Sequence, residues 1–119
     1  MYARALFDLI HRHGDALLAL LVGLEDGADE LFASPNTCAA VEGHLLDIAR
    51  TLAHLPPVVM LRLPQVDWSA WSAVLIALER QQTARREIVW YVASAALPAT
   101  LVLLDELHRR EPDWFQIHY

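Results

Sequence analysis

The segment that most restricts the possible folds of this chain is residues 34–57, SPNTCAAVEGHLLDIARTLAHLPP, which has prolines near both ends. Ser34 is a residue type that favours the helix N-cap, and Pro35 fits the first helical position, where no nitrogen has to donate. Pro56 and Pro57 cannot continue the hydrogen-bond ladder. The segment therefore predicts a helix of about five turns. Its apolar stripe has helical spacing and comprises Ala40, Val41, Leu45, Ile48, Leu52 and Leu55.

Residues 3–24 carry the same periodicity and predict a long amphipathic helix that ends where Gly23 and Gly27 loosen an acidic stretch. No segment alternates apolar and polar residues in the manner of a strand. The sequence therefore predicts an all-α fold, an antiparallel bundle of four to five helices. By length the chain is a single domain, residues 1–119, in which residues 111–119 form a C-terminal tail.

The second half of the chain predicts the remaining helices. Asp67 is suited to cap a helix from Trp68 to about Gln82, and Thr83 is suited to cap the next one. Pro98 is expected to kink or break that last helix, with residues 99–110 as its continuation.

Apolar residues make up 55% of the chain, more than a domain of 119 residues buries easily. Because monomers rarely leave large apolar patches exposed, this surplus predicts a homodimer or another partner. The net charge of −6 gives no general attraction to nucleic acid or to anionic lipid. The only cysteine, Cys38, allows no intramolecular disulfide, and a reducing cytoplasmic location is expected.

A membrane helix is a weaker alternative. Residues 88–104 are uncharged and approach the shortest length that spans a bilayer, although a buried central helix has the same composition. The six histidines show none of the spacings of a helical zinc motif, and the four glycines form no phosphate-binding loop. We therefore expect no metal and no cofactor.

The stretch from the third to the fourth predicted helix is unusually polar and supplies the candidate cleft, formed by Glu79, Arg80, Gln82, Arg85 and Arg86. One interpretation is a solvated loop. The other is a small cationic cleft for RNA phosphate or for the carboxylates of a partner, since the planar guanidinium group suits both. Trp68, Trp71 and Trp90 flank this stretch and are candidate interface anchors.

Residues 31–71, LFASPNTCAAVEGHLLDIARTLAHLPPVVMLRLPQVDWSAW, resemble the HepT-like proteins, which are HEPN-fold toxins of bacterial and archaeal toxin–antitoxin pairs. The matching landmarks are Ala40-Val41, Leu55-Pro56 and the turn Pro64-Gln65-Val66-Asp67-Trp68. Residues 86–107, REIVWYVASAALPATLVLLDEL, resemble the closing helix of that family. With the first helix, the resemblance covers nearly the whole chain.

The resemblance implies a ribonuclease motif of Arg, Asn, His and Tyr near the start of the helix that follows the Asp-Trp turn. Counting from Trp68 places the Arg, His and Tyr at Leu75, Arg80 and Gln82, and counting back from Trp90 places them at Val74, Glu79 and Gln81. Neither register recovers a catalytic residue. RNA cleavage requires a group that titrates near neutrality, which none of these side chains provides.

We therefore expect a HepT-like protein without catalytic residues that acts by dimerisation and partner binding in a toxin–antitoxin or nucleotidyltransferase-linked module. The resemblance implies a nucleotidyltransferase antitoxin as the cognate partner. The alternative is an active RNA endonuclease, with RNA as its partner, that uses Arg80 or Arg85 in a non-standard site. A small membrane-associated helical protein is the second alternative.

Overall fold

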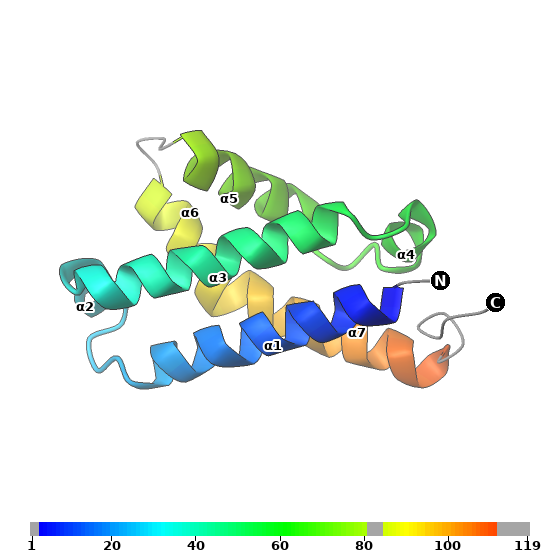
Figure 1. Ribbon diagram of the computed structural model, residues 1–119, viewed down its shortest axis with the longest axis horizontal. Helices are drawn as coiled ribbons and strands as arrows, with labels where there is room; N and C mark the ends of the chain where they lie inside the picture. The colour runs from blue at the N-terminus through cyan, green and yellow to red at the C-terminus, as the bar shows by residue number, and fades with distance from the viewer. Residues whose placement is uncertain (1–2, 81–84, 112–119) are drawn as a thin grey trace.

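The computed structural model describes residues 3–80 and 85–111, and this part of the chain is helical with no strand. Successive long helices run in opposite directions (Figure 1). They are α1 (Ala3–Val22), α3 (Pro35–Ala53), α5 (Trp68–Arg80) and the continuous helix formed by α6 (Arg85–Tyr91), η1 (Val92–Ala96) and α7 (Leu97–Arg110). The predicted all-α antiparallel bundle is confirmed. Two short helices, α2 (Ala28–Ala33) and α4 (Pro57–Arg62), lie in the connections.

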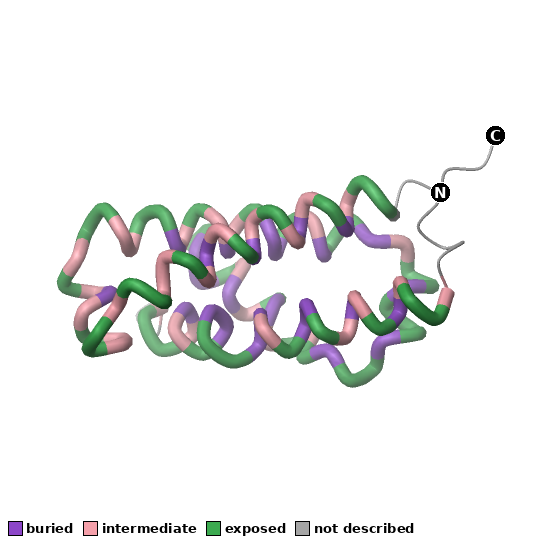
Figure 2. The backbone as a smooth tube through the Cα atoms, turned by 90° about the horizontal axis from the view of Figure 1, so that it is seen from below, coloured by how far each residue is buried: buried purple, intermediate pink, exposed green. Residues whose placement is uncertain are grey.

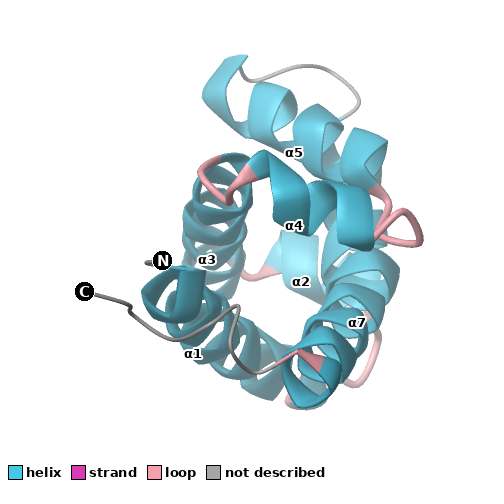
Figure 3. Cartoon of the chain, turned by 90° about the vertical axis from the view of Figure 1, so that its right-hand side faces the viewer, coloured by secondary structure: helices cyan, strands magenta, loops and turns pink. Residues whose placement is uncertain are grey.

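Viewed along its length, the bundle is a ring of helices around one apolar core (Figure 3). α3 packs against α1 and α5, and α7 closes the ring by packing against α1. The molecule measures 48 × 27 × 23 Å, and buried positions line the inner faces of its helices (Figure 2). Among the largest fully buried side chains are Ile10, Leu17, Leu45, Ile48, Leu97 and Leu104.

The predicted signals at the two ends of α3 are confirmed. Pro35 is its first residue, and Ser34 occupies the N-cap position, where its carbonyl accepts from the Cys38 N–H at 2.8 Å but its hydroxyl makes no capping bond. Of the predicted apolar stripe, all members except Ala40 are buried. The local spacing thus identified the face of α3 that packs into the core.

Asp67 caps α5 as predicted, because its Oδ1 accepts from the Ala70 N–H at 3.0 Å. Thr83, the expected cap of the next helix, lies outside the described residues, as does the tail expected at residues 111–119 apart from Glu111.

Pro98 does not end the helix that contains it. The chain is helical from Arg85 to Arg110, with a π-helical turn at Val92–Ala96 immediately before the proline. A proline ring in a helix clashes with the carbonyl four residues earlier, and a π-turn shifts the hydrogen-bond register by one residue, as in the bond from the Leu97 N–H to the Val92 carbonyl. The helix accommodates Pro98 in this way and continues.

The helix Arg85–Arg110 is long and apolar enough, by length and composition, to cross a membrane. In this fold it is also a principal core element. Val89, Val92, Leu97, Leu101 and Leu104 are all buried in the bundle. A core helix of a globular bundle has the same composition, so this feature is weak evidence for a membrane span.

Candidate functional site

The arginines of the predicted cleft lie in different surroundings. Arg85, in the first turn of α6, pairs with Glu42 of α3, with Nε 2.9 Å from Oε2 and Nη2 3.4 Å from Oε1. The two side chains are 29% and 19% exposed, so water screens this pair only partly. Arg85 therefore uses its charge in an ion pair that links α6 to α3.

Glu79 and Arg80 lie at the C-terminal end of α5, where both side chains are exposed. Glu79 forms an ion pair with Arg50 of α3, with Oε1 3.5 Å from Nε. Arg80 has no ion pair within the part of the chain that the structure describes. Gln82, the remaining member of the predicted cleft, lies outside the described residues.

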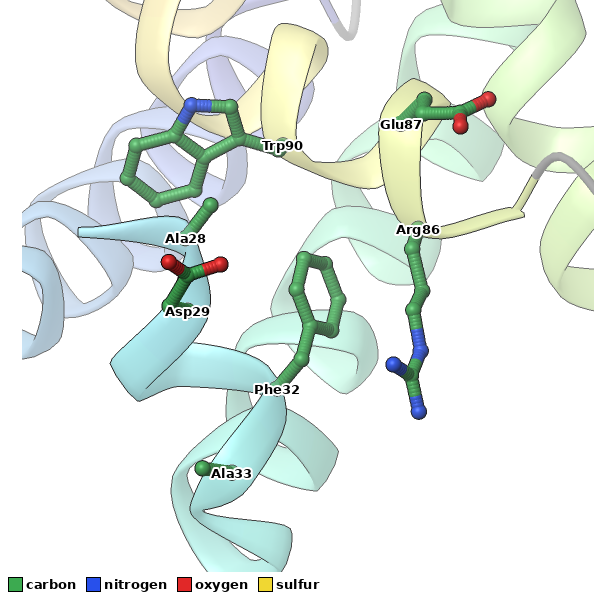
Figure 4. Close-up of a pocket in the computed structure, with 7 residues that line it drawn as sticks. All are labelled: Ala28, Asp29, Phe32, Ala33, Arg86, Glu87 and Trp90. Carbon is green, nitrogen blue, oxygen red and sulfur yellow. The ribbon is translucent and has the colours of Figure 1, made fainter.

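Arg86 lies beside a hollow of about 440 Å³ between α2 and α6, which we call the Trp90 hollow. The Arg86 guanidinium carbon is 5.4 Å from the centroid of the Phe32 ring, within the range of a cation–π contact. Figure 4 shows the Phe32 ring in the middle of the hollow, with Trp90 on one side and Arg86 extending down the other. The hollow is also lined by Ala28, Asp29, Ala33 and Glu87.

The Trp90 indole packs on the turn that precedes α2. Gly27 has a φ of 63°, and a Cβ at this position would lie 3.6 Å from Cζ2 of Trp90. Only glycine adopts this φ freely, so the sequence provides the turn that positions α2 beside α6. The sequence predicted a role for Trp90, but it did not predict that Phe32 and Asp29 line the same hollow.

A neighbouring face of α6 lines a groove of about 370 Å³, the Tyr91 groove, whose lining includes Asp67, Glu87, Ile88 and Tyr91. The Tyr91 hydroxyl donates to Oδ2 of Asp67 at 2.9 Å. Hydrogen bonds from the Ala70 N–H, the Tyr91 hydroxyl and the Ser69 hydroxyl lower the pKa of Asp67, and the bond to Asp67 raises the pKa of Tyr91. The pair therefore holds a carboxylate and a protonated phenol, which gives no base that titrates near neutrality.

A third hollow, of about 270 Å³, brings Cys38 beside Glu42, Arg85 and Arg86. Burial and the nearby Glu42 carboxylate raise the pKa of the Cys38 thiol, although the two arginines act in the opposite direction. The thiol is therefore protonated at neutral pH, which makes it a poor nucleophile. Arg85 and Arg86 are the two members of the predicted cleft that this structure brings together.

The three tryptophans proposed as interface anchors differ in accessibility. Trp71 is 3% exposed, and its Nε1–H donates to the Thr100 hydroxyl at 3.0 Å, so it belongs to the core of the protomer. Trp68 is half-buried and donates from Nε1 to the Leu63 carbonyl at 2.9 Å. Trp68 and Trp90 are therefore the two that retain surface for a partner.

His11, His13 and His44 make contacts between helices. Nδ1 of His13 and Nδ1 of His44 are 2.9 Å apart, which joins α1 to α3, and Nε2 of His11 is 2.9 Å from Oδ1 of Asp105 on α7. Within residues 3–80 and 85–111, no group of three or more histidine, cysteine or acidic side chains is placed to hold a metal ion.

The positions where the resemblance places the ribonuclease motif lie along α5. Val74 is fully buried, Leu75 is half-buried, and Glu79 is engaged with Arg50. Val74 and Leu75 have no group that can transfer a proton to or from RNA. Gln81 and Gln82 lie outside the described residues.

Comparisons of the chain with protein-family models, with curated proteins and with solved structures find no match. The likeness to HepT-like proteins therefore rests on the landmarks in the sequence.

Proposed function

We propose that the protein is a HepT-like helical domain without ribonuclease activity that acts by dimerisation and by binding a partner, within a toxin–antitoxin or nucleotidyltransferase-linked module. The observation that carries this proposal is the apolar surroundings at the position expected for the motif arginine. At the position expected for the motif arginine, the chain has Val74 or Leu75, whose side chains pack into the bundle. A guanidinium at the fully buried Val74 position would lie in the core without a partner, at a large cost in solvation.

The surface of α6 supports a binding role. The Trp90 hollow and the Tyr91 groove lie on neighbouring faces of this short helix, and Glu87 lines both. Together they present aromatic and polar groups, the combination that is common in binding sites. The nucleotidyltransferase that accompanies HepT-like proteins is the partner we infer from the resemblance.

An active ribonuclease has less support. Of its two candidate cations, Arg85 is held by Glu42, and Arg80 has no histidine nearby on α5 or α6. Arg4 and His11 lie seven residues apart on α1 instead of the five that separate the motif Arg and His, and they are engaged elsewhere, Arg4 with Asp8 at 4.0 Å and His11 with Asp105. The membrane alternative rests only on the composition of the helix Arg85–Arg110.

Expression of the wild-type chain and of Arg80→Ala in cells tests the proposal directly. We expect unchanged growth and identical RNA profiles for both, because neither register of the family motif recovers a catalytic residue. Purified protein incubated with structured and single-stranded RNA should likewise give no products above buffer. Defined cleavage products that disappear in Arg80→Ala would overturn the proposal and establish the ribonuclease alternative.

A further inference from the structure

The walls of the Trp90 hollow are aromatic on two sides. Trp90 and Phe32 both remain half-buried, so part of each ring faces the hollow. At about 440 Å³ the hollow falls within the size range of sites that take small molecules or single side chains. Aromatic faces carry negative charge density and attract cations.

The charges around the hollow favour a cation over an anion. Asp29 and Glu87 contribute two carboxylates, and Arg86 contributes one guanidinium. Neither carboxylate has an ion pair or hydrogen bond within the described part of the chain. In Figure 4 the Asp29 carboxylate lies on the Trp90 side of the hollow, whereas Arg86 extends away on the other side and Glu87 points outward. The Trp90 side therefore combines the strongest cation–π partner with an available carboxylate.

The Arg86 guanidinium carbon lies 5.4 Å from the centroid of Phe32, on the side of the ring away from Trp90, so Arg86 leaves the Trp90 side of the hollow open (Figure 4). Arg85 does not reverse the local charge, since Glu42 neutralises it. An anionic ligand in the hollow would meet two carboxylate side chains and a single arginine.

We propose that the Trp90 hollow binds a positively charged organic group, the guanidinium or ammonium of a basic side chain on a partner protein. The cation would lie against the Trp90 ring, with the Asp29 carboxylate as its counter-ion and Phe32 as the second wall. This inference deepens the proposed function, because it gives the chemistry of the partner that the binding role requires.

Titration of the full chain with N-acetyl-arginine amide, followed by the indole and backbone amide signals in nuclear magnetic resonance spectra, tests this site. N-acetyl-citrulline amide is the matched neutral probe, because it has the same shape without the charge. We expect the arginine probe to shift the signals of Trp90, Phe32 and Asp29 and the citrulline probe to leave them unchanged.

Asp29→Asn and Trp90→Leu should each weaken binding of the arginine probe about twofold to fivefold, as expected for exposed charge and cation–π contacts. Asp15→Asn is the matched control, since Asp15 is an exposed aspartate on α1 away from the hollow, and it should bind as the wild type does. Trp90→Phe keeps a ring at this position and should restore part of the affinity. If Trp90→Leu does not fold, Asp29→Asn decides the test.

Equal shifts from the arginine and citrulline probes would overturn the proposal, because the hollow would then select shape alone. Shifts from inorganic phosphate at the same signals, without shifts from the arginine probe, would also overturn it. Spermidine binding at least tenfold tighter than the arginine probe would point to a free polyamine and overturn the partner assignment. None of these results depends on RNA cleavage, so this site and the proposed function can fail separately.

Discussion

Trp71 connects two helices that are distant in sequence, and its loss should show how much one buried polar contact contributes. Its indole donates to the Thr100 hydroxyl, which in turn donates to the Ala96 carbonyl at 2.7 Å. We predict that Trp71→Phe lowers the free energy of unfolding by about 1–3 kcal/mol, because a buried acceptor loses its donor. Trp71→Ala should cost about 3–5 kcal/mol, because it also leaves a cavity.

Urea denaturation measures both changes. Trp68→Phe is the matched control, since it removes the donor to the Leu63 carbonyl at a half-buried position where water can replace it. It should cost less than Trp71→Phe. An equal loss for the two variants would contradict the role assigned to burial.

Single residues also show where prediction from the sequence ends. The apolar face of α3, its proline boundaries and the Asp67 cap depend on spacing along a few turns, and all were predicted. The pairs Arg85–Glu42, Tyr91–Asp67 and His13–His44 join helices that are 24 to 43 residues apart. No local pattern determines such pairs, because they depend on how the helices cross. For the same reason, the sequence did not predict that Phe32 and Asp29 lie beside Trp90.

At the scale of single helices, Asp67 links the start of α5 to α6 and makes stability depend on pH. Its pKa is lowered by the hydrogen bonds it accepts in the folded state. The stabilisation is therefore complete above the unfolded pKa, at about pH 4, and is lost as the pH falls through the lower folded-state pKa. Asp67→Ala should lower the free energy of unfolding by about 0.5–2 kcal/mol at neutral pH, because it removes the cap.

Denaturation of the wild type and Asp67→Ala at a series of pH values checks this expectation. The difference between the two should narrow as the medium becomes more acidic than about pH 4. Asp15→Ala provides the comparison at an exposed aspartate without a capping role. A difference for Asp67→Ala that stays constant into strong acid would show that its carboxylate charge contributes nothing.

Adding a side chain at Gly14 on α1 and at Gly43 on α3 should change the stability of the fold in opposite directions. Gly14 on α1 is buried where α7 approaches, and a Cβ there would lie 3.0 Å from Cδ1 of Leu101. Gly14→Val should therefore destabilise the fold by about 1–3 kcal/mol through overpacking. Gly43 on α3 is exposed with nothing within 4 Å, so Gly43→Ala should stabilise it by about 0.5–1 kcal/mol. Thermal unfolding of the two variants measures the sign of each change in the free energy of unfolding. Stabilisation by Gly14→Val would disprove the close approach of α1 and α7.

The connections between the long helices were also harder to predict from the sequence. The stretch between Gly27 and Ser34 contains α2, although the sequence there predicted only the end of the first helix. Six residues form too short a helix for periodicity to identify, and α2 is stabilised by packing Leu31 into the core and by contact with α3. At Pro98 the sequence predicted a kink or a break, but the helix continues. The π-turn before the proline accommodates its ring, which helix propensity alone does not show.

For the whole molecule, the apolar surplus predicted from composition appears on the surface near Trp68. Met60 lies beside Trp68 and is 38% exposed, its neighbour Leu61 on α4 is 79% exposed, and Ile76 on α5 is 43% exposed. A second copy of the chain is one partner that would remove such exposed apolar side chains from water. We therefore predict that the protein is a homodimer at micromolar concentration, and that this face forms its interface.

Sedimentation velocity decides between the dimer and the 13.4 kDa monomer. Leu61→Glu should shift the equilibrium toward the monomer, because burying an unpaired carboxylate at the interface costs several kcal/mol while the exposed position leaves the fold intact. Val22→Glu is the matched control, since Val22 is 86% exposed at the end of α1, outside this face. It should remain a dimer. A wild-type chain that sediments only as a monomer would remove dimerisation from the proposed function, and dissociation by both variants alike would place the interface elsewhere.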